Sequence, residues 1–172
     1  MTQLIRLFFD ICLFRRGPQD VPVSVWLLRA VLVIYLVLGV AVLSLDNGLE
    51  WRSAAKVLVD LALLAGITWG TLSWRRHQAR FTQTLTALLG TGIVLSIIAL
   101  PVVRWLYLSS AAGGVDPAAA MIWFVLLVWS LAVMGHVMRH ALQGSYALGA
   151  SVAVGYLVAQ MTLLDLLFPE SG

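Results

Sequence analysis

Five long runs of apolar residues, separated by short polar breaks, account for most of the chain. Each run holds about 20 residues or more, and a helix rising about 1.5 Å per residue then spans the roughly 30 Å of a bilayer's hydrocarbon core. The pattern predicts an all-α integral membrane protein with one domain, residues 23–168, and a short outer tail, residues 169–172. The five predicted transmembrane helices are residues 23–43, 54–74, 84–108, 118–137 and 141–168.

Residues 1–22 show a different pattern, with polar side chains on one narrow stripe of an expected helix. Gln3, Arg6 and Asp10 lie at i, i+3 and i+7, and Arg6 and Asp10 are spaced to form an ion pair. Two interpretations stay open: a short amphipathic helix lying flat in the membrane interface, or a helix packed against the bundle. Asp10 interrupts the apolar run and no small-residue cleavage site follows, so we expect this segment to be retained rather than removed as a signal peptide.

The composition agrees with a membrane protein and argues against a nucleic-acid-binding one. Hydrophobic residues make up 61% of the 172 positions and charged residues 11%, against about 25% charged in globular domains. The net charge is +3, but the basic residues lie at predicted helix ends rather than on one soluble face. Cys12 is the single cysteine, which excludes an internal disulfide and a cysteine-based metal site.

The distribution of basic residues predicts the orientation, because cytoplasmic loops carry an excess of Lys and Arg. One side of the predicted topology carries seven of them: Arg6, Arg15, Arg16, Arg75, Arg76, Arg80 and Arg139. The other side carries Arg52, Lys56 and Arg104. We therefore expect the N-terminus in the cytoplasm and the C-terminus on the outside.

Asp60 is a carboxylate inside the second predicted helix, where a charge must be compensated. An unpaired charge in hydrocarbon costs from roughly 2.5 to over 10 kcal/mol, so Asp60 needs a proton, a partner or a wet cavity. The predicted topology places four charged residues at the depth of the outer leaflet: Lys56, Asp60, Arg104 and Asp165. The favoured interpretation of this cluster is a structural ion-pair network; the other is a polar pocket or ion path in which Asp60 titrates.

Small residues at intervals of four predict close helix contacts in two places. Gly66 and Gly70 form such a pair on the helix that carries Asp60. Ser145, Gly149 and Ala153 form a stripe near the start of the fifth predicted helix. We expect both sets to be helix-packing surfaces.

No catalytic motif is present: we find no phosphate-binding glycine loop, no nucleophile elbow and no triad-like set. His136 and His140 lie one turn apart and could in principle ligate a metal or a haem, but no carboxylate or third histidine accompanies them at a fitting spacing. The sequence therefore predicts a protein that is not an enzyme and that holds no cofactor or metal.

The segment RLFFDICLFRRGPQDVPVS, followed directly by five apolar runs, resembles bacterial members of the Yip1-domain family. Gly17-Pro18 and Gly155-Tyr156 are similar to dipeptides of that family. The resemblance implies a polytopic, non-catalytic protein that works through contact with partners. Eukaryotic relatives bind small GTPases and have a longer N-terminal region, which is not present in this sequence, so GTPase binding is not expected.

These observations lead to one main hypothesis and two alternatives. The main hypothesis is a multi-pass protein of the bacterial inner membrane that acts as a scaffold or accessory subunit, with membrane lipids and other membrane proteins as partners in a hetero- or homo-oligomer. The first alternative is a small transporter or ion channel that uses the charges around Asp60 and Arg104. The weaker alternative is a subunit of a redox complex that uses His136 or His140.

Overall fold

The computed structural model describes residues 2–47 and 50–169, and within these ranges it is helical throughout, without a β-strand. Its elements are α1 (Thr2–Cys12), η1 (Pro18–Asp20), α2 (Val25–Asn47), α3 (Trp51–Trp74), η2 (Gln78–Arg80), α4 (Phe81–Ala111), α5 (Pro117–Ala141) and α6 (Tyr146–Leu167). The predicted tail, residues 169–172, lies outside the described residues except for Pro169.

The helices α2 to α6 are long and apolar enough to cross a membrane, as the hydrophobic pattern predicted. Their ends differ from the predicted ones because backbone hydrogen bonding and capping, rather than hydropathy, determine where a helix begins and ends. Helix α5 runs on through the polar end of its segment to Ala141, and α6 begins only at Tyr146. The hydroxyl of Ser145 accepts a hydrogen bond from the Leu148 amide and thereby caps α6.

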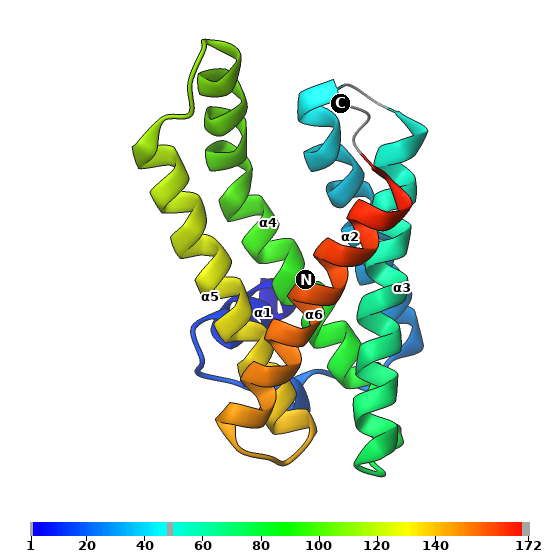
Figure 1. Cartoon of the computed structure of the whole chain (residues 1–172). Helices are drawn as coiled ribbons and strands as arrows, with labels where there is room; N and C mark the ends of the chain where they lie inside the picture. The colour runs from blue at the N-terminus through cyan, green and yellow to red at the C-terminus, as the bar shows by residue number, and fades with distance from the viewer. Residues whose placement is uncertain (1, 48–49, 170–172) are drawn as a thin grey trace.

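The five long helices run alternately up and down, so that the α3–α4 and α5–α6 connections lie together at the lower end in Figure 1. Helix α4 is central and contacts α1, α2, α3 and α5, whereas α6 packs chiefly against α5. Toward the upper end in Figure 1, α4 and α5 diverge together from α2, α3 and α6.

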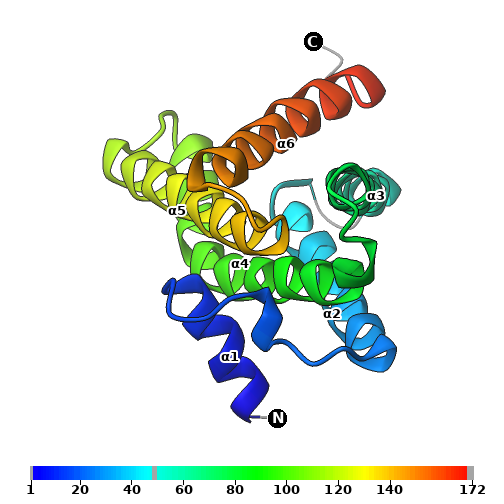
Figure 2. The same cartoon turned by 90° about the horizontal axis from the view of Figure 1, so that it is seen from below.

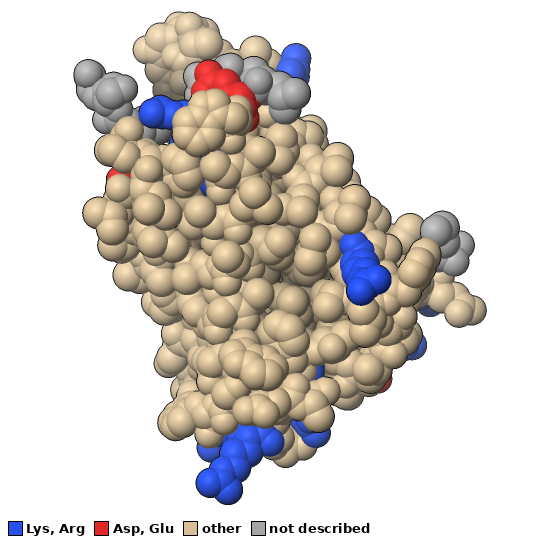
Figure 3. All heavy atoms as spheres, turned by 90° about the vertical axis from the view of Figure 1, so that its right-hand side faces the viewer, with Lys and Arg blue, Asp and Glu red and all other residues tan. Residues whose placement is uncertain are grey.

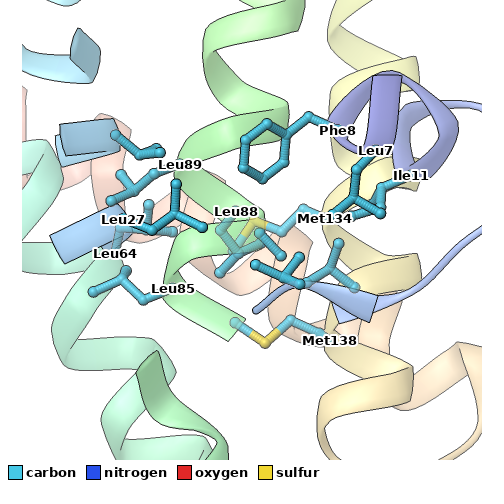
Figure 4. Close-up of a cluster of buried hydrophobic side chains, with 14 of the residues drawn as sticks. Leu7, Phe8, Ile11, Leu27, Leu64, Leu85, Leu88, Leu89, Met134 and Met138 are labelled. Atoms are coloured by element: carbon cyan, nitrogen blue, oxygen red, sulfur yellow. The ribbon is translucent and has the colours of Figure 1, made fainter. Parts of the chain in front are cut away.

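The core lies in the lower half of the bundle. The buried residues of α4 form a continuous run, Thr84 to Thr91, whereas the helix beyond Pro101 has none. Figure 4 shows this core, in which Leu85, Leu88 and Leu89 of α4 meet Met134 and Met138 of α5 and side chains of α1. The upper parts of α4 and α5 are therefore held mainly by each other.

Helix α1 packs against the bundle, which is one of the two arrangements expected for it. It lies across α4, on the side away from α6 in Figure 2, and buries Leu7, Phe8, Ile11 and Cys12. The Phe8 ring lies directly on Gly90 of α4, where any Cβ would overlap the ring. Glycine at position 90 is thus what lets α1 approach α4 so closely.

The ion pair predicted between Arg6 and Asp10 is replaced by another. Asp10 Oδ2 lies 3.6 Å from Arg16 Nε, and Arg6 is exposed. The chain turns back after α1, which brings Arg16 to Asp10. Two further bonds hold this turn to α5: Trp129 Nε1 donates to the Cys12 carbonyl at 3.0 Å, and His136 Nε2 lies 2.9 Å from the Arg16 carbonyl oxygen.

We expect Cys12 of the folded protein to resist alkylation. Burial raises the pKa of its thiol from 9.0 to about 12, so the reactive thiolate is about one part in 10⁵ at pH 7. Labelling with a maleimide in mild detergent, followed by mass measurement, should show no adduct until the protein is unfolded. A Ser110→Cys variant, at an exposed position, supplies the positive control. Full labelling of native wild-type protein at pH 7 would show that Cys12 is accessible.

Candidate functional site

The buried face of α3 carries Asp60. The buried residues of this helix follow one another at intervals of three or four and so lie on one stripe: Ser53, Val57, Asp60, Leu64, Thr68 and Leu72. Asp60 is 8% exposed. Its carboxyl group is therefore directed into the bundle, toward α2 and α6.

Three neutral donors from two other helices bind the Asp60 carboxyl group. The Tyr35 hydroxyl of α2 donates to Oδ2 at 2.7 Å, and the Gln160 side-chain amide of α6 donates to Oδ1 at 2.7 Å. The Tyr156 hydroxyl, one turn before Gln160, also donates to Oδ1. We call Tyr35, Asp60, Tyr156 and Gln160 the Asp60 network.

The network stabilises both the acid and the arrangement of the helices. Burying a carboxyl group is unfavourable unless its oxygens are hydrogen-bonded, and each bond to a charged acceptor contributes about 1.5–3 kcal/mol. Helix α6 packs chiefly on α5 and α2 chiefly on α4. Asp60 of α3 thus joins α2 and α6, two helices that have few direct contacts with each other.

The predicted ion-pair cluster of Lys56, Asp60, Arg104 and Asp165 does not form. Among the described residues the ion pair found is that of Arg16 with Asp10, and none joins these four. Arg104 and Asp165 are exposed, and Lys56 is half-buried. The prediction compared only how deep the four residues lie along their helices. A contact also requires that the side chains lie on helix faces directed toward one another. Asp165 follows Gln160 by five residues, about 140° around α6, and so is directed away from Asp60.

Two cavities adjoin the Asp60 network. One, of about 330 Å³, is lined by Asp60, Lys56 and Ser96 among others, and the second, of about 170 Å³, by Tyr156 and other residues of α2 to α6. Tyr35 and Gln160 line both cavities. The Asp60 network therefore lies where the two cavities meet.

The two predicted small-residue sets have different surroundings. Gly149 and Ala153 are buried, and Gly149 lies against the backbone of Gly135 in α5. Gly66 and Gly70 of α3 are exposed, and a Cβ at either would meet nothing within 4 Å. Gly149 and Ala153 thus pack against other parts of this chain, whereas Ser145, predicted to belong to the same packing surface, is exposed and caps α6 instead. Contact of Gly66 and Gly70 with another chain stays a prediction.

His136 is buried, and its ring contacts Phe14 and His140 with centroid distances of 5.3 and 4.7 Å. With its hydrogen bond to Arg16 it holds the segment after α1 in place. Within the described ranges no group of three or more His, Cys, Asp or Glu side chains is placed to hold a metal ion. The histidine pair thus has a packing role that its spacing alone did not suggest.

Tyr35, Tyr156 and Gln160 were missed as site residues. The hydrophobic pattern treats tyrosine as an aromatic membrane residue, and it gives no reason to pair a hydroxyl with an acid on another helix. A signal was nevertheless present, because Tyr156 and Gln160 lie at i and i+4 on one helix face. Two hydrogen-bonding side chains one turn apart in an apolar segment indicate a polar partner opposite.

Comparison with known proteins gives no relative to guide the assignment: no family model, no curated protein and no solved structure matches this chain. The resemblance to Yip1-domain proteins therefore stays a prediction.

Proposed function

We propose that this chain is a multi-pass protein of the bacterial inner membrane, with its N-terminus in the cytoplasm. The five apolar helices support insertion, and the connections carrying Arg75, Arg76 and Arg80 and following Arg139 lie at one end of the bundle. On the face seen in Figure 3, most charged side chains gather at the two ends of the molecule, and the broad band between them is uncharged except for a basic side chain toward its right-hand side.

We further propose that it is a small carrier or channel in which Asp60 binds a proton or a small cation. The observation that carries this proposal is that a buried carboxyl group, bound only by neutral donors among the described side chains, adjoins two cavities. Neutral donors bring no positive charge to the carboxyl group, and no ion pair joins Asp60 to a basic side chain among the described residues, so the place of a counter-ion is left to a proton or a small cation. If Asp60 formed an ion pair with Arg104, the positive charge of the guanidinium group would already compensate the carboxylate.

The test is ion flux into liposomes containing the purified protein, followed with a pH-sensitive dye trapped inside. Wild-type protein should raise the rate of proton or Na⁺-coupled proton movement above that of protein-free liposomes. Asp60→Asn should return the rate to the protein-free level, because the amide cannot exchange the proton. Asp165→Asn, which changes an exposed acid, should retain the wild-type rate. Wild-type flux no higher than in protein-free liposomes would refute the proposal.

The scaffold or accessory-subunit hypothesis remains the second candidate, and the exposed face of α3 favours it. Gly66 and Gly70 leave the backbone of α3 open to close approach by a helix of another membrane protein. Mass measurement after purification in mild detergent distinguishes the two functions. A stoichiometric heteromeric partner, lost in a Gly66→Leu variant, would favour the accessory subunit.

A further inference from the structure

A third cavity, lined by polar side chains, lies at the other end of the bundle from Lys56, where η1 and the connections α3–α4 and α5–α6 meet. It has a volume of about 400 Å³, and its lining residues are Gln19, Arg80, Arg139, His140, Gln143 and Gly144. A smaller cavity of about 90 Å³ shares Gln19, Arg80 and His140 with it. None of the residues found lining the two cavities is acidic.

We call the larger of these the basic cavity. Contacts with neighbouring residues hold the side chains of its two arginines in place. Arg80 Nη1 donates to the His140 carbonyl at 3.3 Å. With the Gln143 amide assigned in the orientation that satisfies both its oxygen and its nitrogen, its oxygen accepts from Arg80 Nη2 at 2.7 Å. The Arg139 guanidinium group lies over the Tyr146 ring, 5.7 Å from its centroid. Side chains fixed in this way lose less conformational entropy when a ligand binds.

The charge of the cavity is strongly positive. Arg80 and Arg139 are half-buried, which weakens the screening of their charge by water. Arg75 adds a third guanidinium group near Gly144. The acid that faces this group of side chains is Asp20, whose Oδ2 already accepts a hydrogen bond from the Gly17 amide at 3.0 Å.

We propose that this basic cavity binds a phosphate group, carried either by the headgroup of an anionic phospholipid or by a free phosphate ion. Guanidinium groups match the geometry of phosphate oxygens, and the side-chain amides of Gln19 and Gln143 offer further donors at the rim. The site is separate from the Asp60 network and does not depend on ion transport. The proposed ligand binds at the end of the bundle that carries most of the basic residues.

Thermal unfolding of the full chain in detergent, followed by the fluorescence of its seven tryptophans, tests this proposal. The probes are inorganic phosphate, phosphatidylglycerol and, as a zwitterionic comparison, phosphatidylcholine. A concentration-dependent rise of the unfolding midpoint with phosphatidylglycerol alone would identify a lipid ligand. A rise with inorganic phosphate would identify the free ion. No rise with either anion would overturn the proposal.

Variants connect that rise to the cavity. Arg139→Gln should weaken binding of the active probe about tenfold, a change of roughly 1.4 kcal/mol. Arg104→Gln removes an equal charge from an exposed position outside the cavity and should leave the affinity unchanged. Gln143→Glu, which places an acid beside Arg80 at an exposed position, should weaken binding as well and covers the case in which Arg139→Gln does not fold. Wild-type affinity in the folded cavity variants would overturn the proposal.

Discussion

Replacing Gly149 with leucine is expected to prevent α6 from docking on α5. A Cβ at this position would overlap the Gly135 carbonyl oxygen and would lie 2.9 Å from the Arg139 backbone nitrogen. These obstacles belong to the backbone of α5 and cannot rotate away as a side chain could. We expect a loss of about 3 kcal/mol or more in the free energy of unfolding, measured by denaturant titration of the purified protein.

Gly155 provides the control for this prediction. It lies on the same helix, and a Cβ there would meet nothing within 4 Å. Gly155→Leu should therefore change the free energy of unfolding by no more than about 0.5 kcal/mol. Equal stability of the two leucine variants would show that α6 does not need the close approach at Gly149.

Replacing Asp60 with leucine is the second substitution for which we expect a large loss of stability. Leucine has a similar size but accepts no hydrogen bond, so the hydroxyls of Tyr35 and Tyr156 and the amide of Gln160 lose their acceptor. Each buried donor left without a partner costs about 1–3 kcal/mol, which gives several kcal/mol for the set. Denaturant titration measures the loss, and Asp165→Leu at an exposed position should change little.

A double-mutant cycle separates the hydrogen bonds from general packing. In a Tyr156→Phe background one donor is already absent, so Asp60→Leu should cost less than it does in the wild-type protein. The difference between the two costs measures the coupling of Tyr156 with Asp60. Strictly additive losses would mean that the contact between these side chains contributes nothing to stability.

The number of long helices could be predicted because it depends on local sequence alone. Apolar runs of sufficient length form helices whatever their neighbours, and α2 to α6 all appear where the runs lie. Helix ends were less predictable, because capping by a residue such as Ser145 or continued backbone hydrogen bonding shifts them by several residues.

The composition of the site could not be predicted, because it depends on the rotation and spread of the helices. Topology places Asp60 and Arg104 at a similar depth, but α4 diverges from α3 toward the end that carries Arg104. Spacing likewise identifies Gly66 and Gly149 as equivalent members of small-residue pairs. Only the packed structure shows that Gly149 faces α5, whereas a Cβ on Gly66 would meet nothing within 4 Å.

The docking of α1 has a consequence for the order in which the protein matures. The carbonyl groups of Cys12 and Arg16 find their partners 117 and 120 residues further along the chain, on Trp129 and His136 of α5. These partners are therefore synthesised more than a hundred residues after the segment that they hold. Helix α1 must therefore wait, with its apolar face uncovered, until α5, the fourth of the long helices α2 to α6, has been made.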